Sequence, residues 1–506
     1  MKTSSVSRVA LAIVFAGAIG SAAAQNGAHD KPAAAHHENG HENGNGVLRL
    51  LPADSVTEHS IDTAAGKLAY TATAGTLPFY DQSGERSASI FYTAYIVKNA
   101  GGKSAGAKRP LTFVFNGGPG AASAFLHLGL VGPRILDLGP DGRDAAHGKI
   151  RDNPDTWLRF TDLVLIDPIG TGWSRTVKPD DAKHFYGVRA DADAMAKAIA
   201  LYIAKNNRTD SPKYLFGESY GGFRAAKVAR ALQREQGINT AGIVMLSPML
   251  EGWLTFGDDE SALRAALELP SLAAAALERK NTFSADALAA AEKFAMTDYL
   301  TTLAGASPQG EAGRAFYGRV AQMSGLPLDV VTKARGFITS AYINSLQSGK
   351  IVSRYDATFA VDNPYPESQS AQGSDPILDG VARAYGGAMA DYARNELGFQ
   401  TEMTYVLLSD AVRHWDWQGG RLQASAEDDL RVLLAFDRSF RLLIAHGYSD
   451  MVTPFGMTRY VLNHLPPTDP PGRAQLKLYR GGHMLYLDAA SRKAFSADAG
   501  AFYRTE

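Results

Sequence analysis

The stretch YLFGESYGGFRAA, residues 214–226, contains the pattern Gly-x-Ser-x-Gly centred on Ser219. The apolar residues before the pattern read as the end of a buried strand, and its glycines permit a sharp turn. Four apolar positions then recur with helical spacing: Ala225, Val228, Ala229 and Leu232. Gly237 follows, where it can end that helix. A strand, a tight turn and a helix around this pattern predict that Ser219 is a nucleophile on an α/β sheet.

A second copy of the same pattern, GKSAG at residues 102–106, lies in a run of Gly, Lys and Ala. No apolar strand precedes this copy and no helical period follows it. We therefore expect a loop there, because the pattern requires its strand-turn-helix context to place a nucleophile.

The N-terminus has the three parts of a secretory signal peptide. Lys2 and Arg8 precede an apolar run that is too short to span a bilayer, and Ala22 and Ala24 supply a small-x-small cleavage site. We expect residues 1–24 to be removed and the protein to be exported, to the periplasm or the medium. The chain of 506 residues has no cysteine, so a large apolar core must replace disulfides. An exported chain without cysteine suggests a bacterial envelope or secreted protein.

Residues 25–46 are rich in Asn, Gly, Ala and His, and have no hydrophobic period. We predict a disordered linker there. Four of its histidines could recruit a transition metal: His29, His36, His37 and His41. Their spacing resembles no closed metal site, so a solvated tether is the preferred interpretation.

The overall charge excludes some classes of partner. The 51 basic residues nearly balance the 52 acidic residues, which gives no electrostatic argument for nucleic acid or an anionic membrane. After cleavage of the signal peptide, no remaining segment is long and apolar enough to span a membrane. The sequence leaves the oligomeric state open.

The organisation after residue 46 predicts one large sheet domain with an insertion. Two alternating runs, GKLAYTATAG and ASIFYTAYIV, predict antiparallel strands. Five short apolar runs separated by helical sequence predict a mostly parallel sheet with both faces covered: PLTFVFNGGPG, DLVLIDPIGTG, KYLFGESYGG, GIVMLSP and RLLIAHGYSD. Residues 251–385 are largely Ala-rich and helical, so we expect an inserted helical cap between two parts of the sheet domain, 47–250 and 386–506.

A nucleophilic serine requires a histidine to take its proton and a carboxylate to orient that histidine. In this kind of sheet the chain order is Ser, then Asp or Glu, then His. Of the twelve histidines, four follow Ser219: His414, His446, His464 and His483. His483 follows an alternating strand and a pair of glycines, and Asp450 follows the apolar strand before it. We predict Ser219, Asp450 and His483 as the catalytic residues.

The remaining candidates fit less well. His446 lies only four residues from Asp450, which leaves no separate loop for each. His414 and His464 have charged or aromatic helical neighbours that suit surface or packing roles. Asp167 also follows a strand, but it precedes Ser219 and fails the order test.

An acyl-transfer site also requires two donors for the developing oxyanion. The glycine turn after residues 112–115, in the stretch FNGGPGAAS, offers backbone amides for this role. Gly118 and Tyr220 are the predicted donors.

Five ordered motifs together resemble the serine carboxypeptidase family, peptidase family S10: NGGPG, DPIGTGWS, GESYGG, GYSDMVTP and GGHM. The resemblance implies an α/β-hydrolase fold and removal of C-terminal residues from peptides through an acyl-enzyme on Ser219. Peptides with a free C-terminus are the implied partner, with no metal and no cofactor. It further implies that Asn116, Gly117 and Glu218 hold the terminal carboxylate. Because an acid and a carboxylate share a proton only below the acid's pKa, we expect this binding to weaken toward alkaline pH.

The chain departs from the family's pattern at three positions. Val114 replaces the usual Trp, Leu130 replaces an acid, and Ala121 replaces a Cys, in keeping with a bacterial branch without disulfides. The alternative function is therefore an esterase or acyltransferase with the same triad, for which Val114 and Leu130 would form an adapted acyl pocket. A non-catalytic binding protein is a weaker alternative, because no triad member is lost.

Aromatic residues near strand ends offer a further lining for the pocket beneath the cap, although such residues are more often part of a core. The candidates are Trp173, Phe216, Tyr220, Trp415 and Trp417.

Overall fold

The structure is a computed structural model that describes residues 46–64, 66–99, 106, 108–139, 142–346, 349–367 and 375–504. The predicted signal peptide lies outside the described residues. So do the linker histidines and, except for Gly106, the second Gly-x-Ser-x-Gly stretch.

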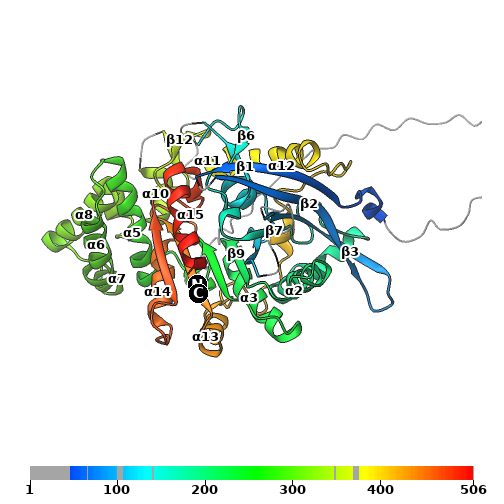
Figure 1. Cartoon of the computed structure of the whole chain (residues 1–506). Coiled ribbons are helices and arrows are strands. Elements are labelled where there is room, and N and C mark those ends of the chain that lie inside the picture. The colour runs from blue at the N-terminus through cyan, green and yellow to red at the C-terminus, as the bar shows by residue number, and fades with distance from the viewer. Residues whose placement is uncertain are drawn as a thin grey trace, which may run out of the picture.

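A ten-stranded sheet runs through the centre of the molecule (Figure 1). Its order is β1-β2-β3-β7-β4-β9-β10-β13-β14, with β8 paired to β3. Pairing is parallel from β7 to β14 and antiparallel among β1, β2, β3 and β7. The strands are β1 Ser55–Thr63, β2 Gly66–Tyr80, β3 Arg86–Val97, β4 Leu111–Phe115, β7 Asp162–Ile166, β8 Arg175–Thr176, β9 Lys213–Glu218, β10 Gly242–Leu246, β13 Arg441–Gly447 and β14 Ala474–Tyr479. The predicted mostly parallel sheet is confirmed.

The central strands are continuous apolar runs because both of their faces are covered. Every residue of β4, β7 and β10 is buried. Four helices pack against one face: α2 Val188–Lys205, α3 Tyr220–Glu235, α13 Glu427–Phe436 and α14 Phe455–His464. Two helices pack against the other: α12 Ala384–Asn395 and α15 Ala489–Arg504.

The sequence reading missed β1, which pairs with β2 along its whole length. Its burial alternates between half-buried and exposed positions, and Ile61 is its buried residue. A half-exposed edge strand carries too few apolar residues to stand out by its hydrophobic period.

Helices α5 to α10, which lie between β10 and β13 in the chain, form a group to one side of the sheet (Figure 1). They enclose an apolar cluster of their own that includes Leu269, Tyr299 and Val320. The helices are α5 Ala262–Arg279, α6 Ala285–Phe294, α7 Leu300–Ala304, α8 Gly310–Ser324, α9 Leu328–Lys333 and α10 Thr339–Ser345, followed by the hairpin β11 Lys350–Val352 and β12 Ala360–Asp362. This grouping supports an inserted cap, while its limits at residues 251 and 385 stay predictions.

Local signals explain how this helical group begins and breaks. Ser284 caps α6, because its hydroxyl accepts a hydrogen bond from the Ala287 amide at 3.1 Å. A π-helical turn, Ala295–Tyr299, separates α6 from α7. In the described part of the chain, no helix combines the length and apolarity needed to cross a bilayer.

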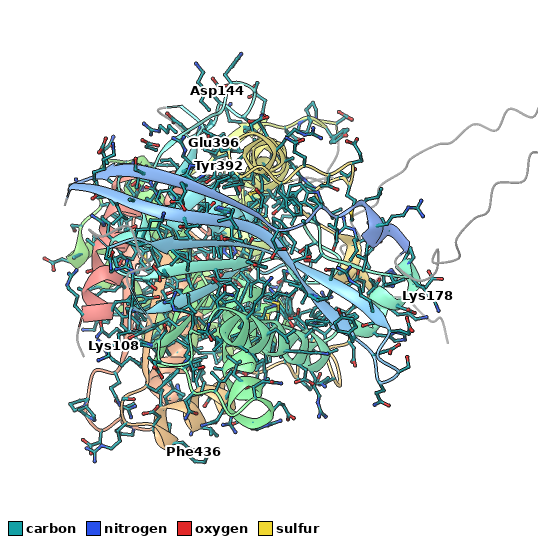
Figure 2. The ribbon with its side chains drawn as sticks, turned by 45° about the vertical axis from the view of Figure 1, so that its right-hand side comes forward. Lys108, Asp144, Lys178, Tyr392, Glu396 and Phe436 are labelled. Atoms are coloured by element: carbon teal, nitrogen blue, oxygen red, sulfur yellow. The ribbon has the colours of Figure 1, made fainter. Side chains whose placement is uncertain are left out.

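A small hairpin, β5 Arg134–Asp137 and β6 Lys149–Asp152, rises beside α12. Figure 2 marks Asp144 in its turn, and Tyr392 and Glu396 at the end of α12 beneath it. Arg134 Nε donates to Glu396 Oε2 at 2.8 Å, which ties the hairpin to α12.

The remaining short elements connect these parts. They are α1 Ala124–Leu126, the π-helical turn η2 His127–Val131, α4 Gly252–Thr255, α11 Pro376–Gly380, and the 3-10 turns Gly46–Leu50, Trp157–Arg159, Pro179–Phe185, Asp410–His414 and η7 Leu485–Leu487.

Candidate active site

Ser219 lies in a tight turn between β9 and α3, with φ 61° and ψ −127°. This backbone conformation is strained for a residue with a side chain, and such strain concentrates at functional sites. Glycines make the turn possible: a Cβ on Gly217 would lie 1.9 Å from the Gly221 carbonyl oxygen. The half-buried Ser219 hydroxyl makes no capping hydrogen bond to α3. The structure therefore contains the predicted strand, turn and helix.

Asp450 and His483 lie together in the loops after β13 and β14. The Nδ1 of His483 is 2.9 Å from Oδ2 of Asp450, and both side chains are buried. Oδ1 of Asp450 accepts hydrogen bonds from the amides of Val452 and Thr453 at 2.8 and 3.1 Å. The Thr453 hydroxyl is 2.9 Å from Oδ2. Both oxygens of the Asp450 carboxylate therefore accept hydrogen bonds.

The two groups shift each other's pKa. Burial opposes ionisation of Asp450, but His483 and the hydrogen bonds outweigh it and hold the Asp450 pKa well below its usual range. Burial likewise opposes a charged imidazole, but the Asp450 carboxylate raises the pKa of His483 above its ordinary value. An ionised Asp450 fixes the proton on Nδ1 of His483, which leaves Nε2 available as a base.

The loop that carries His483 rests on the segment between β11 and β12. The His483 amide donates to the Tyr355 carbonyl at 2.6 Å, and the two rings meet edge to face at 5.1 Å. The Met451 amide donates to the Arg354 carbonyl at 3.0 Å. The Ser449 hydroxyl donates to Asp356 Oδ1 at 2.7 Å. Sequence reasoning missed this support, because residues 353–357 belong to no motif.

The histidines that the sequence analysis set aside occupy other positions. His446 is buried within β13, with Nε2 2.8 Å from the Thr458 hydroxyl and Nδ1 3.9 Å from Asp450 Oδ2. His414 and His464 are exposed. Asp167 is buried and accepts hydrogen bonds from both the amide and the hydroxyl of Ser123 at 2.7 Å, so it holds the turn after β4.

The glycine turn after β4 presses against the serine turn. A Cβ on Gly117 would lie 2.6 Å from both the Glu218 carbonyl oxygen and the Tyr220 amide nitrogen. Gly118 has φ 103°, a conformation that favours glycine. Its amide has no hydrogen-bond acceptor among the described residues. Tyr220 begins α3, so its amide has no acceptor within the helix. Neither amide has a backbone acceptor among the described residues, so their role as oxyanion donors stays a prediction.

Asn116 and Glu218 are in direct contact. The Asn116 amide group donates to Glu218 Oε2 at 2.6 Å, and its own oxygen accepts from the Leu126 amide at 3.1 Å. Tyr486 also contacts Glu218, through its hydroxyl. Burial raises the pKa of Glu218 to about 7, against the lowering effects of His483, Tyr486 and Asn116. Glu218 therefore holds a proton in a large fraction of molecules near neutral pH.

A cavity of about 850 Å³ lies beside the His483 loop. Aromatic and apolar side chains on its wall include Tyr355, Tyr385, Met484 and Tyr486. Its charged residues are Asp137, Arg143, Arg151, Glu278, Asp356, Arg480, Asp488 and Arg492.

The proposed acyl-pocket residues Val114 and Leu130 do not line this cavity. Both are fully buried in the core beside the sheet. The five aromatic candidates are also absent from its wall. Phe216 stacks on Trp157 in the core, and Trp415 Nε1 donates to the Tyr220 hydroxyl at 3.1 Å. Packing therefore accounts for these side chains.

Comparison with known proteins shows which family the chain resembles. The serine carboxypeptidase family, peptidase S10, matches residues 69–478. Serine carboxypeptidase-like 44 of Arabidopsis thaliana is 28% identical over 152 residues, which is 28% of this chain and 30% of that protein. The retinoid-inducible serine carboxypeptidase of Rattus norvegicus is 30% identical over 128 residues, 25% of each chain. These alignments thus span less than a third of either curated relative.

A solved structure covers far more of the chain. The prohormone-processing carboxypeptidase of Saccharomyces cerevisiae superposes with a TM-score of 0.54 and 14% identity, over 86% of this chain and 91% of that one. This likeness confirms the α/β-hydrolase fold. The family match over residues 69–478, which is most of the chain, shows that the protein belongs to the serine carboxypeptidase family.

Proposed function

We propose that the protein is a serine-type carboxypeptidase that hydrolyses the C-terminal peptide bond of peptides. The observation that carries this proposal is the pair formed by Glu218 and Asn116 directly beside Ser219. A buried carboxyl group with a pKa of about 7 can share its proton with a substrate carboxylate. A serine nucleophile next to such a group favours attack on the last peptide bond.

In the proposed mechanism, Ser219 Oγ attacks the carbonyl carbon while His483 Nε2 takes the hydroxyl proton. The Gly118 and Tyr220 amides bind the oxyanion of the tetrahedral intermediate. The C–N bond then breaks as His483 returns the proton to the leaving amine. Water attacks the acyl-enzyme with His483 as its base, and release of the acid restores Ser219. Asp450 orients the imidazole throughout.

Recognition of the free C-terminus is assigned to Asn116, Gly117 and Glu218. These three residues form the proposed carboxylate clamp for the released residue, and Tyr486, on the wall of the large cavity, contacts Glu218 of this clamp. We infer that this cavity receives the side chain of that residue. Besides the attacking water, the steps above use side chains and amides of this chain, and peptides with a free C-terminus are its proposed substrates.

We further infer that residues 1–24 direct export and that residues 25–46 form a tether. The periplasm or the medium is the proposed destination. The bacterial assignment rests on this leader and on the absence of cysteine, whereas the relatives compared above come from a plant and a mammal. An esterase or acyltransferase with the same triad is the alternative function, although Val114 and Leu130 no longer provide an acyl pocket in its favour.

The test uses the chain without residues 1–24 and an N-blocked dipeptide, offered as the free acid, the methyl ester and the amide, from about pH 4 to about pH 8. We expect cleavage of the free acid to weaken toward the alkaline end, where Glu218 loses its proton. Ser219→Ala should lose about 10⁴-fold or more in kcat. Ser219-dependent cleavage of the ester with an inert free acid would replace the carboxypeptidase by the esterase.

A further inference from the structure

Tyr486 contacts Glu218, the carboxyl group of the proposed clamp. Its hydroxyl lies 3.3 Å from Oε1 and 3.2 Å from Oε2 of Glu218, and its side chain is 1% exposed. Asn116 donates to Oε2 alone. Among the described residues, Tyr486 is therefore the one side chain with a donor within hydrogen-bonding distance of Oε1, and its single proton is shared between the two oxygens. This leaves Oε1 as the carboxyl oxygen best placed to share a proton with a ligand.

A glycine on a distant segment makes room for the Tyr486 ring. Gly129 lies in the π-helical turn η2, and a Cβ there would sit 2.5 Å from Cε2 and 2.7 Å from Cδ2 of Tyr486. Real Cβ atoms do not approach an aromatic ring so closely, so the ring would have to move. The space left by Gly129 thus fixes where the Tyr486 hydroxyl meets Glu218.

Tyr486 is also coupled to the catalytic loop by position. It lies three residues after His483, in the 3-10 turn η7, and its carbonyl accepts a hydrogen bond from Arg492 Nη1 at 3.3 Å. Its ring forms part of the wall of the cavity. One side chain therefore touches the clamp, the cavity and the loop that holds the base.

We propose that Tyr486 is a positioning residue for the terminal carboxylate: it orients the Glu218 carboxyl group and sets the highest pH at which the protein prefers free-acid substrates. This inference rests on the carboxypeptidase function proposed above.

The physical reason is that a donated hydrogen bond stabilises the ionised form of a carboxyl group. The Tyr486 hydroxyl therefore lowers the pKa of Glu218, against the raising effect of burial. The other titratable groups that interact with Glu218 are His483, which lowers its pKa when charged, Asp450, which raises it, and the neutral phenols of Tyr355 and Tyr385. These four are unchanged in Tyr486→Phe, so the variant isolates the hydroxyl.

Tyr486→Phe should separate two effects. The Glu218 carboxyl group loses a fixed orientation, so KM for the free acid should rise about 5- to 20-fold while kcat changes less than about twofold. Glu218 also keeps its proton to higher pH, so the alkaline limb of kcat/KM should move upward by about half a pH unit. The methyl ester, which has no carboxylate, should show neither change. These measurements are made on the protein without residues 1–24, from about pH 5 to about pH 9.

Two further variants control the result. Tyr479→Phe removes a comparable hydrogen bond, from the Tyr479 hydroxyl to Asp498 at 2.7 Å in β14, away from the clamp. It should leave the ratio of free-acid to ester KM unchanged. Gly129→Ala keeps the hydroxyls of Tyr479 and Tyr486 but displaces the Tyr486 ring. It should therefore raise KM for the free acid as Tyr486→Phe does.

The outcomes distinguish this inference from the function on which it rests. If the wild type prefers the free acid, and Tyr486→Phe changes neither its KM nor its alkaline limb, the role of Tyr486 is wrong and the carboxypeptidase stands. An equal rise in KM for acid and ester also overturns it, since that indicates a general structural role. A wild type that does not prefer the free acid overturns both. If Tyr486→Phe does not fold, Gly129→Ala decides: an unchanged KM for the free acid, or an equal rise for acid and ester, overturns the role of Tyr486.

Discussion

The two halves of the candidate site are built in different ways. The serine half, formed by the turns after β4 and β9, packs within the sheet domain, with glycines where the two turns meet. The acid and base half, formed by the loops after β13 and β14, rests on residues 354–357 between β11 and β12. The first half is therefore specified by local sequence, whereas the second depends on a segment from the helical insertion.

This difference teaches where each half is vulnerable. A change in the sheet domain around Ser219 disturbs packing that the whole fold shares. A change beneath His483 disturbs a loop that the insertion supports from one side, with a second tether from the Ser247 hydroxyl to the His483 carbonyl at 2.9 Å. We expect a change around Ser219 to reduce the stability of the fold, and a change beneath His483 to reduce kcat.

The largest expected effect tests whether the two halves act as one unit. Ser219→Ala and His483→Ala should each lower kcat by about 10⁴- to 10⁶-fold, because the hydroxyl is a poor nucleophile without its base. The double variant should be no slower than either single variant. Steady-state kinetics on the N-blocked dipeptide gives all three values. Additive losses would mean that His483 does not act through Ser219.

The second prediction compares one glycine from each half. In Gly482→Ala, the new Cβ would lie 1.9 Å from the Tyr355 carbonyl oxygen, so the His483 loop must shift. A displaced base lowers kcat by about 10²-fold. In Gly222→Ala, the new Cβ would lie 2.5 Å from Pro248 Cβ, which should cost about 1–3 kcal/mol of folding free energy.

Urea unfolding and kcat, measured on both variants, check this contrast. Gly482→Ala should keep a midpoint closer to wild type than Gly222→Ala, and Gly222→Ala should keep the higher kcat. The reverse order would mean that the insertion stabilises the fold more than it orients the base.

The third prediction concerns how kcat/KM depends on pH through Glu218, whose carboxyl group contacts both halves of the site. Glu218 is protonated below its pKa of about 7 and ionised above it. Since only the protonated form can donate to a substrate carboxylate, kcat/KM for the free acid should fall about tenfold per pH unit above that value. In Glu218→Gln the amide donates at every pH, so this alkaline limb should disappear. An unchanged limb in the variant would assign it to another group.

Much of this arrangement could be predicted from the sequence, because each predicted part has a short-range cause. Gly217 and Gly221 lie within two residues of Ser219, and apolar strand ends precede both Asp450 and His483. The chain order then paired residues that are far apart. Tyr355 and Tyr486 could not be found in this way. Tyr355 contributes a backbone carbonyl, which any residue carries, and Tyr486 depends on the space over Gly129.

The surroundings of Val114 and Leu130 could not be predicted from the sequence for a related reason. The residues that Val114 and Leu130 replace suggest an acyl pocket, but the face of the sheet and of η2 on which they lie puts both in the core. Strand alternation puts Val114 on the face opposite Phe113 and Phe115. Sequence motifs compared one residue at a time do not show which face of the sheet a cavity borders.

The smallest expected effect lies where the two halves meet. The Thr453 hydroxyl is 2.9 Å from Asp450 Oδ2, 2.8 Å from the Ser247 carbonyl and 3.2 Å from His483 Nδ1. Its single proton is shared between the Ser247 carbonyl, which follows β10 beside the serine turn, and the Asp450 carboxylate. Asp450 keeps three other donors in Thr453→Val, so kcat should fall only about 3- to 10-fold.

Thr453→Ser is the matched control, because it keeps the hydroxyl and removes the methyl group. If the bridge matters, kcat should stay near the wild-type value in Thr453→Ser and fall in Thr453→Val. Equal losses in both variants would instead assign the effect to packing of the methyl group. In that case the two halves would be joined by the contacts of the His483 loop alone, and a change at Tyr355 or Ser247 should then affect the rate more than any change at Thr453.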